Sequence, residues 1–169
     1  LVDGQPPEVG HILRQARLGD TLARLASAGL DDFYRGALGR EMGDELAALG
    51  SPLTADDLAA YHAQVVEPLE VRVGNANLYN LPPPTQGLAS LMILGIFSRL
   101  GVQDAEGFDH LHGLVESTKR AFRVRDRVVT DPGRLPAEPH DFLTDTALAA
   151  RAGEIDPAKA LPWPDPAAP

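Results

Sequence analysis

The sequence of 169 residues contains no cysteine. Without thiols there is no disulfide framework, no thiolate nucleophile and no zinc site built on sulfur. A long apolar run is also missing, because the longest one, Leu88 to Phe97, is only about half of what a bilayer span requires. No basic segment followed by an apolar stretch opens the chain, and Leu1 is not an initiator methionine. We therefore expect no membrane partner and an N-terminus that is missing or processed, while the compartment stays open.

Positive charge is scarce. The chain has 15 basic residues against 24 acidic ones, a formal net charge of −9. Because phosphate binding needs a positive surface, this balance argues against nucleic acid as a partner. The sequence also lacks a Gly-x-Ser-x-Gly nucleophile elbow, a Gly-Lys-Ser/Thr phosphate loop and a His-Glu-x-x-His metal motif. No self-contained catalytic site is therefore predicted.

The composition is otherwise that of an ordinary globular protein, with 44% hydrophobic and 23% charged residues. Its length suits one domain with a core, so we predict a single domain over 1–169, of which 152–169 is a proline-rich tail. Asp20 is a good N-cap for a helix that ends at Gly29, and a second helix is expected over 37–49.

Local signals then predict a short helix and a hairpin. Thr54-Ala55-Asp56-Asp57 has the form of a capping box, and we interpret its adjacent carboxylates as stabilising the start of a helix. The alternation over 69–73 is typical of a half-buried strand, Gly74-Asn75 supplies a turn, and 78–81 returns as the second strand. The sequence thus predicts a two-stranded β-hairpin.

The segment after the hairpin is expected to be helical. A triple proline, 82–84, ends the hairpin, and Thr85 can cap the helix 88–100. That helix is apolar all round, which predicts burial. With one short helix near 144–151 and an extended end, the predicted fold class is α+β: a mostly helical fragment with one two-stranded β-hairpin.

A charged helix is predicted over 109–129. Glu116 and Arg120 are four residues apart and attract, whereas Arg123 and Arg127 have the same spacing and repel. This pattern favours either a salt-bridged face packed against other protein or a site for an outside anion, and both remain open. His110 and His112 are two residues apart, so on a helix they diverge and do not share a metal easily.

Several segments in order resemble the large-subunit region of gamma-glutamyltransferases (gamma-glutamyltranspeptidases). Matches span roughly residues 20 to 160, and no single motif is diagnostic. The matching segments are Leu22-Ala23-Arg24-Leu25-Ala26-Ser27-Ala28-Gly29, Phe33-Tyr34-Arg35-Gly36, Leu53-Thr54-Ala55-Asp56-Asp57-Leu58-Ala59-Ala60-Tyr61, Glu67-Pro68-Leu69, Tyr79-Asn80-Leu81-Pro82-Pro83-Pro84, then Glu116, Lys119, Ala121, Asp126-Arg127 and Asp131-Pro132.

The resemblance implies an N-terminal-nucleophile hydrolase fold, in which two sheets lie between helical layers (αββα). Such a precursor cuts itself before a threonine, whose own α-amine then serves as the base for attack on a gamma-glutamyl or related acyl amide. By the resemblance, this chain is the C-terminal part of the large subunit, and the nucleophilic threonine lies outside it. It also implies no cofactor and, by family habit, a periplasmic or secreted location, with a cytoplasmic one still open.

The seven threonines of the chain are internal and have no free amine beside them. We therefore assign no catalytic, cofactor-binding or metal-binding residue, and expect the chain alone to be an inactive scaffold. Its implied partners are the small subunit of its own precursor, a small-molecule amide substrate and a second copy of itself bound through exposed apolar surface. The alternative is a stand-alone helical protein-interaction module without activity.

One segment departs from the family pattern. After the triple proline the better-known members have Ser-Ser-Gly-Gly, whereas this sequence has Thr85-Gln86-Gly87-Leu88. Any Thr or Ser can start a helix there. The change is also compatible with a branch that hydrolyses other amides, including cephalosporin-type acylases, so the acyl donor and acceptor stay open.

Overall fold

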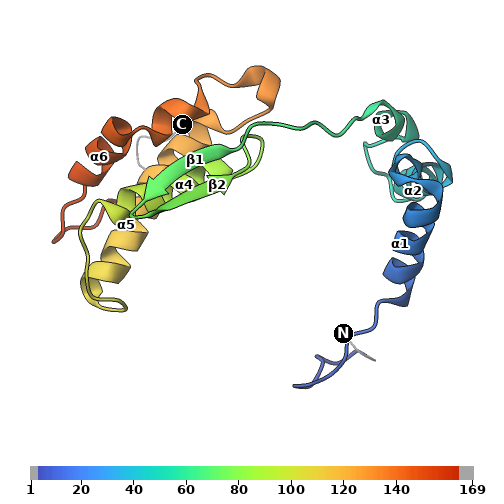
Figure 1. Ribbon diagram of the computed structural model, residues 1–169, viewed down its shortest axis with the longest axis horizontal. Helices are drawn as coiled ribbons and strands as arrows, with labels where there is room; N and C mark the ends of the chain where they lie inside the picture. Colours follow the sequence, from blue (N-terminus) through green and yellow to red (C-terminus); the bar gives the residue numbers. More distant parts are fainter. Residues whose placement is uncertain (1–3, 164–169) are drawn as a thin grey trace. The chain divides into compact units, whose positions relative to one another are not determined.

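A computed structural model describes residues 4–163 of the chain. The chain divides into two compact units, 1–64 and 65–169, and each unit is described by itself (Figure 1). The interpretation of 1–169 as one domain stays a prediction about the complete protein.

The first unit is helical. It contains α1 (Ala16–Ala28), the 3-10 turn η1 (Leu30–Phe33), α2 (Ala37–Ala48) and α3 (Ala55–Ala60). The expected N-cap at Asp20 is wrong: the N-cap of α1 is Gln15, five residues earlier, and it makes no side-chain cap hydrogen bond. The reason is that Ala16, Arg17 and Leu18 are strong helix formers, so the helix extends by another turn. Gly29, at φ 93°, ends α1 as expected.

The capping box at the start of α3 is confirmed. The Thr54 hydroxyl accepts from the Asp57 amide at 3.2 Å, while the Asp57 carboxylate accepts from the Thr54 amide at 2.9 Å. The Asp57 carboxylate also accepts from the Thr54 hydroxyl at 2.7 Å. This hydrogen bond first, and then the one from the Thr54 amide, hold the pKa of Asp57 below its usual value. Asp57 is thus engaged in the helix start.

Polar contacts and small residues hold the first unit together. Asp32 accepts from Arg24 at 2.9 Å and from the Ala37 amide at 2.7 Å, which ties α1 to the start of α2. A Cβ on Gly43 would lie 2.7 Å from that of Ala55, so only glycine allows α2 and α3 this close. In the described part of this unit Gly39 and Gly43 are the only buried residues, so it has no apolar core of its own.

The second unit begins with the hairpin. Strands β1 (Leu69–Val73) and β2 (Ala76–Asn80) are antiparallel and pair Leu69 with Asn80 and Val71 with Leu78. The predicted hairpin is therefore present, although β2 starts two residues before the expected position. Leu69 and Val71 are buried at 0% and 3% exposure, so β1 presents its apolar face to the core.

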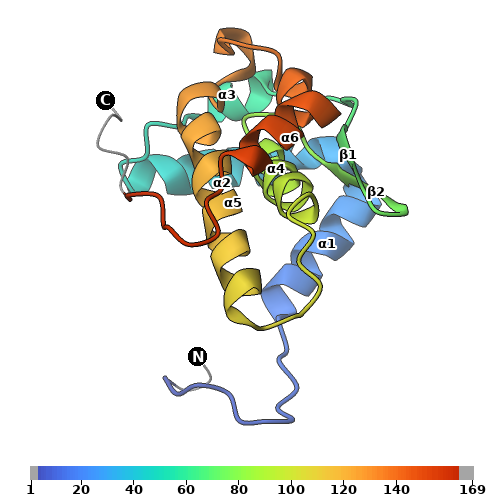
Figure 2. The same ribbon diagram turned by 90° about the vertical axis from the view of Figure 1, so that its left-hand side faces the viewer.

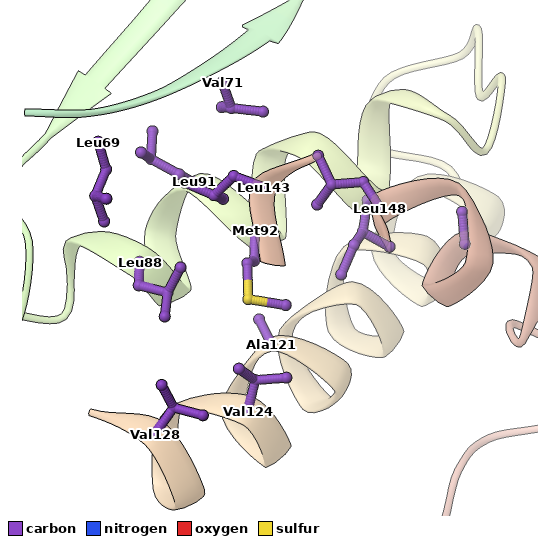
Figure 3. Close-up of a cluster of buried hydrophobic side chains, with 12 residues drawn as sticks. Leu69, Val71, Leu88, Leu91, Met92, Ala121, Val124, Val128, Leu143 and Leu148 are labelled. Carbon is purple, nitrogen blue, oxygen red and sulfur yellow. The ribbon is translucent and has the colours of Figure 1, made fainter. Parts of the chain in front are cut away.

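Helix α4 (Gly87–Ser98) lies in the middle of this unit, between the hairpin and α5, with α6 also against it (Figure 2). The core consists of apolar side chains from β1, α4, α5, the 3-10 turn that contains Leu143, and α6 (Figure 3). The predicted burial is largely confirmed, since Leu91 and Met92 are 2% and 0% exposed; Leu94, at 43%, is an exception. A Cβ on Gly95 would lie 2.8 Å from the Leu148 side chain, so α6 uses this glycine to approach α4 closely.

Helix α5 (Phe108–Val128) is the longest helix, with 21 residues. Its buried face includes Ser117, Ala121 and Val124. The apolar stripe that starts with Leu111, Leu114 and Val115 is 37% to 57% exposed at these positions. Among the described residues no helix is both long and apolar enough to cross a membrane.

The segment that leads to the predicted proline-rich tail is folded. It forms the 3-10 turns η2 (Pro132–Arg134) and η3 (Pro139–Leu143) and then α6 (Asp145–Gly153), which Thr144 caps. Leu143 and Leu148 are buried and join the core. The segment 154–163 then runs on as a strap. The end of the predicted tail, 164–169, lies outside the described residues.

Candidate functional site

A buried ionic cluster lies on α5. Glu116 and Arg120 are 1% and 5% exposed. The Glu116 carboxylate accepts from Lys119 Nζ at 2.8 Å and from Arg120 Nη1 at 2.8 Å. The ion pair expected from the four-residue spacing is therefore present, and Lys119 adds a second cation to it.

The same carboxylate holds the strap. The Leu161 backbone amide donates to both oxygens of Glu116 at 3.2 Å, and Lys119 Nζ donates to the Leu161 carbonyl at 2.8 Å. Arg120 Nη2 donates to the Glu154 carbonyl. Three side chains of α5 thus fix two points of the strap, 34 to 45 residues further along the chain.

The electrostatics of the cluster favour a charged carboxylate. Burial alone raises the pKa of Glu116, but the hydrogen bonds from Lys119, Arg120 and the Leu161 amide outweigh it and hold that pKa below its usual value. Because cationic and amide donors already engage both oxygens, Glu116 is a structural anchor and not a general base available to substrate.

The two histidines on α5 have different partners. The His110 ring lies edge-on to Phe97, with centroids 5.1 Å apart. His112 stacks on Phe108 at 5.4 Å, and its Nε2 lies 2.9 Å from the Asp156 carbonyl oxygen. Within residues 4–163 no group of three or more His, Asp or Glu side chains is arranged to hold a metal ion.

Several of the described threonines form hydrogen bonds with the local backbone. Thr54 and Thr144 cap helices, and Thr118 donates to the Leu114 carbonyl at 2.8 Å. The expected cap at Thr85 is wrong by one residue, because the N-cap of α4 is Gln86 and no side chain caps it. Thr85 instead accepts from the Gly87 amide at 3.1 Å and donates to the Leu81 carbonyl at 2.9 Å. The Thr54 hydroxyl also donates to the Asp57 carboxylate at 2.7 Å, a contact within the capping box of α3.

The turn before α4 explains why glycine occupies position 87. A Cβ there would lie 2.1 Å from the Leu81 carbonyl oxygen and 2.9 Å from the Asn80 side chain. The end of β2 and the first turn of α4 are therefore in direct contact. Gly87 is required by packing, while its neighbours Thr85, Gln86 and Leu88 are the residues in which this chain departs from the pattern of better-known members.

These elements superpose on solved N-terminal-nucleophile hydrolases. The cephalosporin acylase from Bacillus halodurans matches with a TM-score of 0.72 and 30% identity, over 92% of this chain and 29% of that one. The gamma-glutamyltranspeptidase from Pseudomonas nitroreducens matches with a TM-score of 0.74 and 28% identity, over 90% of this chain and 47% of that one. The fold is thus part of this class of hydrolase, as the resemblance implied.

Sequence comparison then gives the family. The pattern described as Gamma-glutamyltranspeptidase matches residues 1–169, and the chain belongs to that family. Among curated relatives, the oxamate amidohydrolase proenzyme of Klebsiella pneumoniae is 47% identical over 163 residues, which are 96% of this chain and 31% of that protein. The chain therefore spans about a third of the length of this relative, and it is part of an enzyme of the family.

Proposed function

We propose that this chain is a non-catalytic scaffold segment of an autoprocessed amide hydrolase of the gamma-glutamyltranspeptidase family. In the complete protein, an N-terminal threonine outside this chain attacks the acyl amide, with its own α-amine as the base. The observation that carries the proposal is the match of the family along residues 1–169, in which Thr85 and Thr118 donate to nearby backbone carbonyls.

The substrate we propose is a small amide of the oxamate type. The relative named as oxamate amidohydrolase shares 47% identity with this chain, against 28% for the Pseudomonas transpeptidase and 30% for the Bacillus acylase. The departure at Thr85-Gln86-Gly87-Leu88 agrees with a branch that acts on other amides. Hydrolysis or transfer of gamma-glutamyl groups is the second candidate, because the family as a whole bears that name.

The outer face of α5 supports a scaffold role. Leu111, Leu114 and Val115 are exposed in this unit, and next to them the Arg125 guanidinium lies 3.6 Å from the Phe122 ring centroid. A continuous apolar stripe on a soluble helix is normally covered. We propose that the rest of the precursor, including the small subunit, covers it; a second copy of the chain is the alternative occupant.

The decisive experiment uses the full-length gene product. Intact mass and N-terminal sequencing after expression are expected to give two fragments, the smaller beginning with threonine. Ammonia release from oxamate and nitroaniline release from gamma-glutamyl-p-nitroanilide are then compared at equal enzyme concentration. Faster turnover of oxamate supports the proposed substrate, and faster turnover of the glutamyl anilide supports the second candidate. A single uncleaved chain inactive on both would favour the interaction module instead.

A further inference from the structure

A cavity of about 360 Å³ is lined by residues of α5, η3 and α6 and by Glu154, the first residue of the strap. Four guanidinium groups and one carboxylate provide its charged lining, and the ring of Phe142 is among its apolar walls. The charged residues are Arg120, Arg123, Arg127, Arg151 and Glu154. This concentration of positive charge stands in a chain whose formal net charge is −9.

Part of the positive charge in this lining has no acidic partner among the described residues. Arg120, Arg123 and Arg127 share a face of α5, but Arg120 pairs with Glu116 at 2.8 Å and Arg123 has a contact of its own. Glu154 adds only a loose contact, because its carboxylate lies 3.7 Å from Arg120 Nε and its side chain is 58% exposed. Within the described residues neither Arg127 nor Arg151 forms an ion pair with an acid.

Two buried donors of the cavity lack an acceptor among residues 4–163. Arg120 is 5% exposed; its two terminal nitrogens are bound by Glu116 and by the Glu154 carbonyl, yet its Nε has no hydrogen-bond partner. Arg151 Nε is also buried without a partner, and its guanidinium lies 5.9 Å from the Phe142 ring centroid. Buried donors of this kind are expected to have acceptors.

We propose that this cavity is an oxyanion site that binds a carboxylate. Planar guanidinium groups bind carboxylates through paired, charge-assisted hydrogen bonds, and several of them suit a dicarboxylate better than a single charge. A cavity of about 360 Å³ has room for such a group. Two sources supply this chemistry: a free small dicarboxylate, or an Asp or Glu side chain from the parts of the precursor outside this chain.

The test uses the full-length, processed protein with succinate as the probe, in titration calorimetry at constant ionic strength. The variants are Arg127→Gln and Arg151→Gln, with Arg134→Gln as the matched control, since Arg134 is an exposed arginine of η2. For a free dicarboxylate we expect saturable binding that each cavity variant weakens roughly tenfold or more, while the control binds as the unmodified protein does.

A side-chain carboxylate gives a different result. If a side chain of the precursor occupies the cavity, the unmodified protein does not bind succinate. Arg151→Gln then melts at a lower temperature than the unmodified protein, and high salt reduces this difference. Arg134→Gln melts at the same temperature as the unmodified protein. Arg151→Lys, which keeps the charge, controls for misfolding and should retain most of the stability. The proposal is overturned if succinate does not bind and both cavity variants melt no lower than the control. Binding and melting are read without amide hydrolysis, so this outcome is independent of the proposed function.

Discussion

At the scale of single residues, Glu116 is the carboxylate on which the described ionic contacts converge. Its oxygens accept from Lys119, Arg120 and the Leu161 amide, and it is 1% exposed. Removal of one partner from a buried pair leaves the other charge uncompensated. Glu116→Gln is therefore expected to destabilise the protein by about 3–5 kcal/mol at neutral pH. Urea unfolding measures this, with the exposed Glu138→Gln as control.

The pH dependence of this variant follows from the lowered pKa of Glu116. A carboxylate whose folded-state pKa is lowered stabilises the fold above its unfolded-state pKa, about 4.3 for Glu, and loses that contribution as the pH falls toward the lower folded value. The unmodified protein should thus lose stability below about pH 5, and Glu116→Gln should lose less over the same range. Parallel acid profiles of the two proteins would contradict the assignment.

The core offers a second test at this scale. Leu91 and Met92 are buried against the hairpin and α5, whereas Leu94 on the same helix is 43% exposed. Leu91→Ala or Met92→Ala should cost about 2–5 kcal/mol through lost contacts and a residual cavity. Leu94→Ala should cost clearly less. Thermal unfolding of the three variants checks this, and losses well below 1 kcal/mol at both buried positions would mean that α4 lies on an open surface.

At the scale of elements, the start of α4 depends on one glycine. Gly87→Ala would place a Cβ 2.1 Å from a backbone carbonyl oxygen, and a backbone atom cannot move aside as the end of a flexible side chain can. We expect a large loss of stability, since the β2–α4 turn has to shift. Gly19→Ala, inside α1 and with nothing within 4 Å, is the matched control and should stabilise the helix by up to about 1 kcal/mol. Melting temperatures of the two variants should move in opposite directions.

Elements marked by local chemistry could be predicted from the sequence. Thr54 with Asp57 specified a helix start, and Gly74-Asn75 specified the hairpin, because their partners are a few residues away. The prediction that the first helix starts at Asp20 was wrong, because a residue that suits an N-cap can also lie inside a longer helix. The helical spacing of the apolar residues on α5 could not predict which face of the helix is buried, because tertiary packing decides that.

The candidate site was predictable to a lesser degree. The four-residue spacing of Glu116 and Arg120 correctly predicted the ion pair between them. The third partner, the Leu161 amide, lies 45 residues away and has no side-chain signature at all. Arg151, which lines the same cavity as Arg123 and Arg127, lies on another helix, α6. The sequence therefore left an outside anion open as one of two interpretations but could not predict a cavity.

At the scale of the whole molecule, the two units differ in how they are stabilised. The second unit has a continuous apolar core around α4, while the described part of the first unit buries only two glycines. In the isolated chain we expect slow amide hydrogen exchange in α4 and the adjoining half of α5, and fast exchange throughout α1 and α2. In the complete enzyme the first unit should become protected. Equal protection of both units in the isolated chain would contradict this.

The attachment of the strap also has a consequence for evolution. Glu116 binds the backbone amide of Leu161, and Lys119 binds its carbonyl, so neither contact depends on the side chain at that position. Selection for this attachment therefore acts on Glu116 and Lys119 of α5, while the residue at position 161 of the strap can change. The exception is proline, which has no N–H to donate. Proline already occupies position 162, one residue beyond the attachment, and the register of the strap keeps it there.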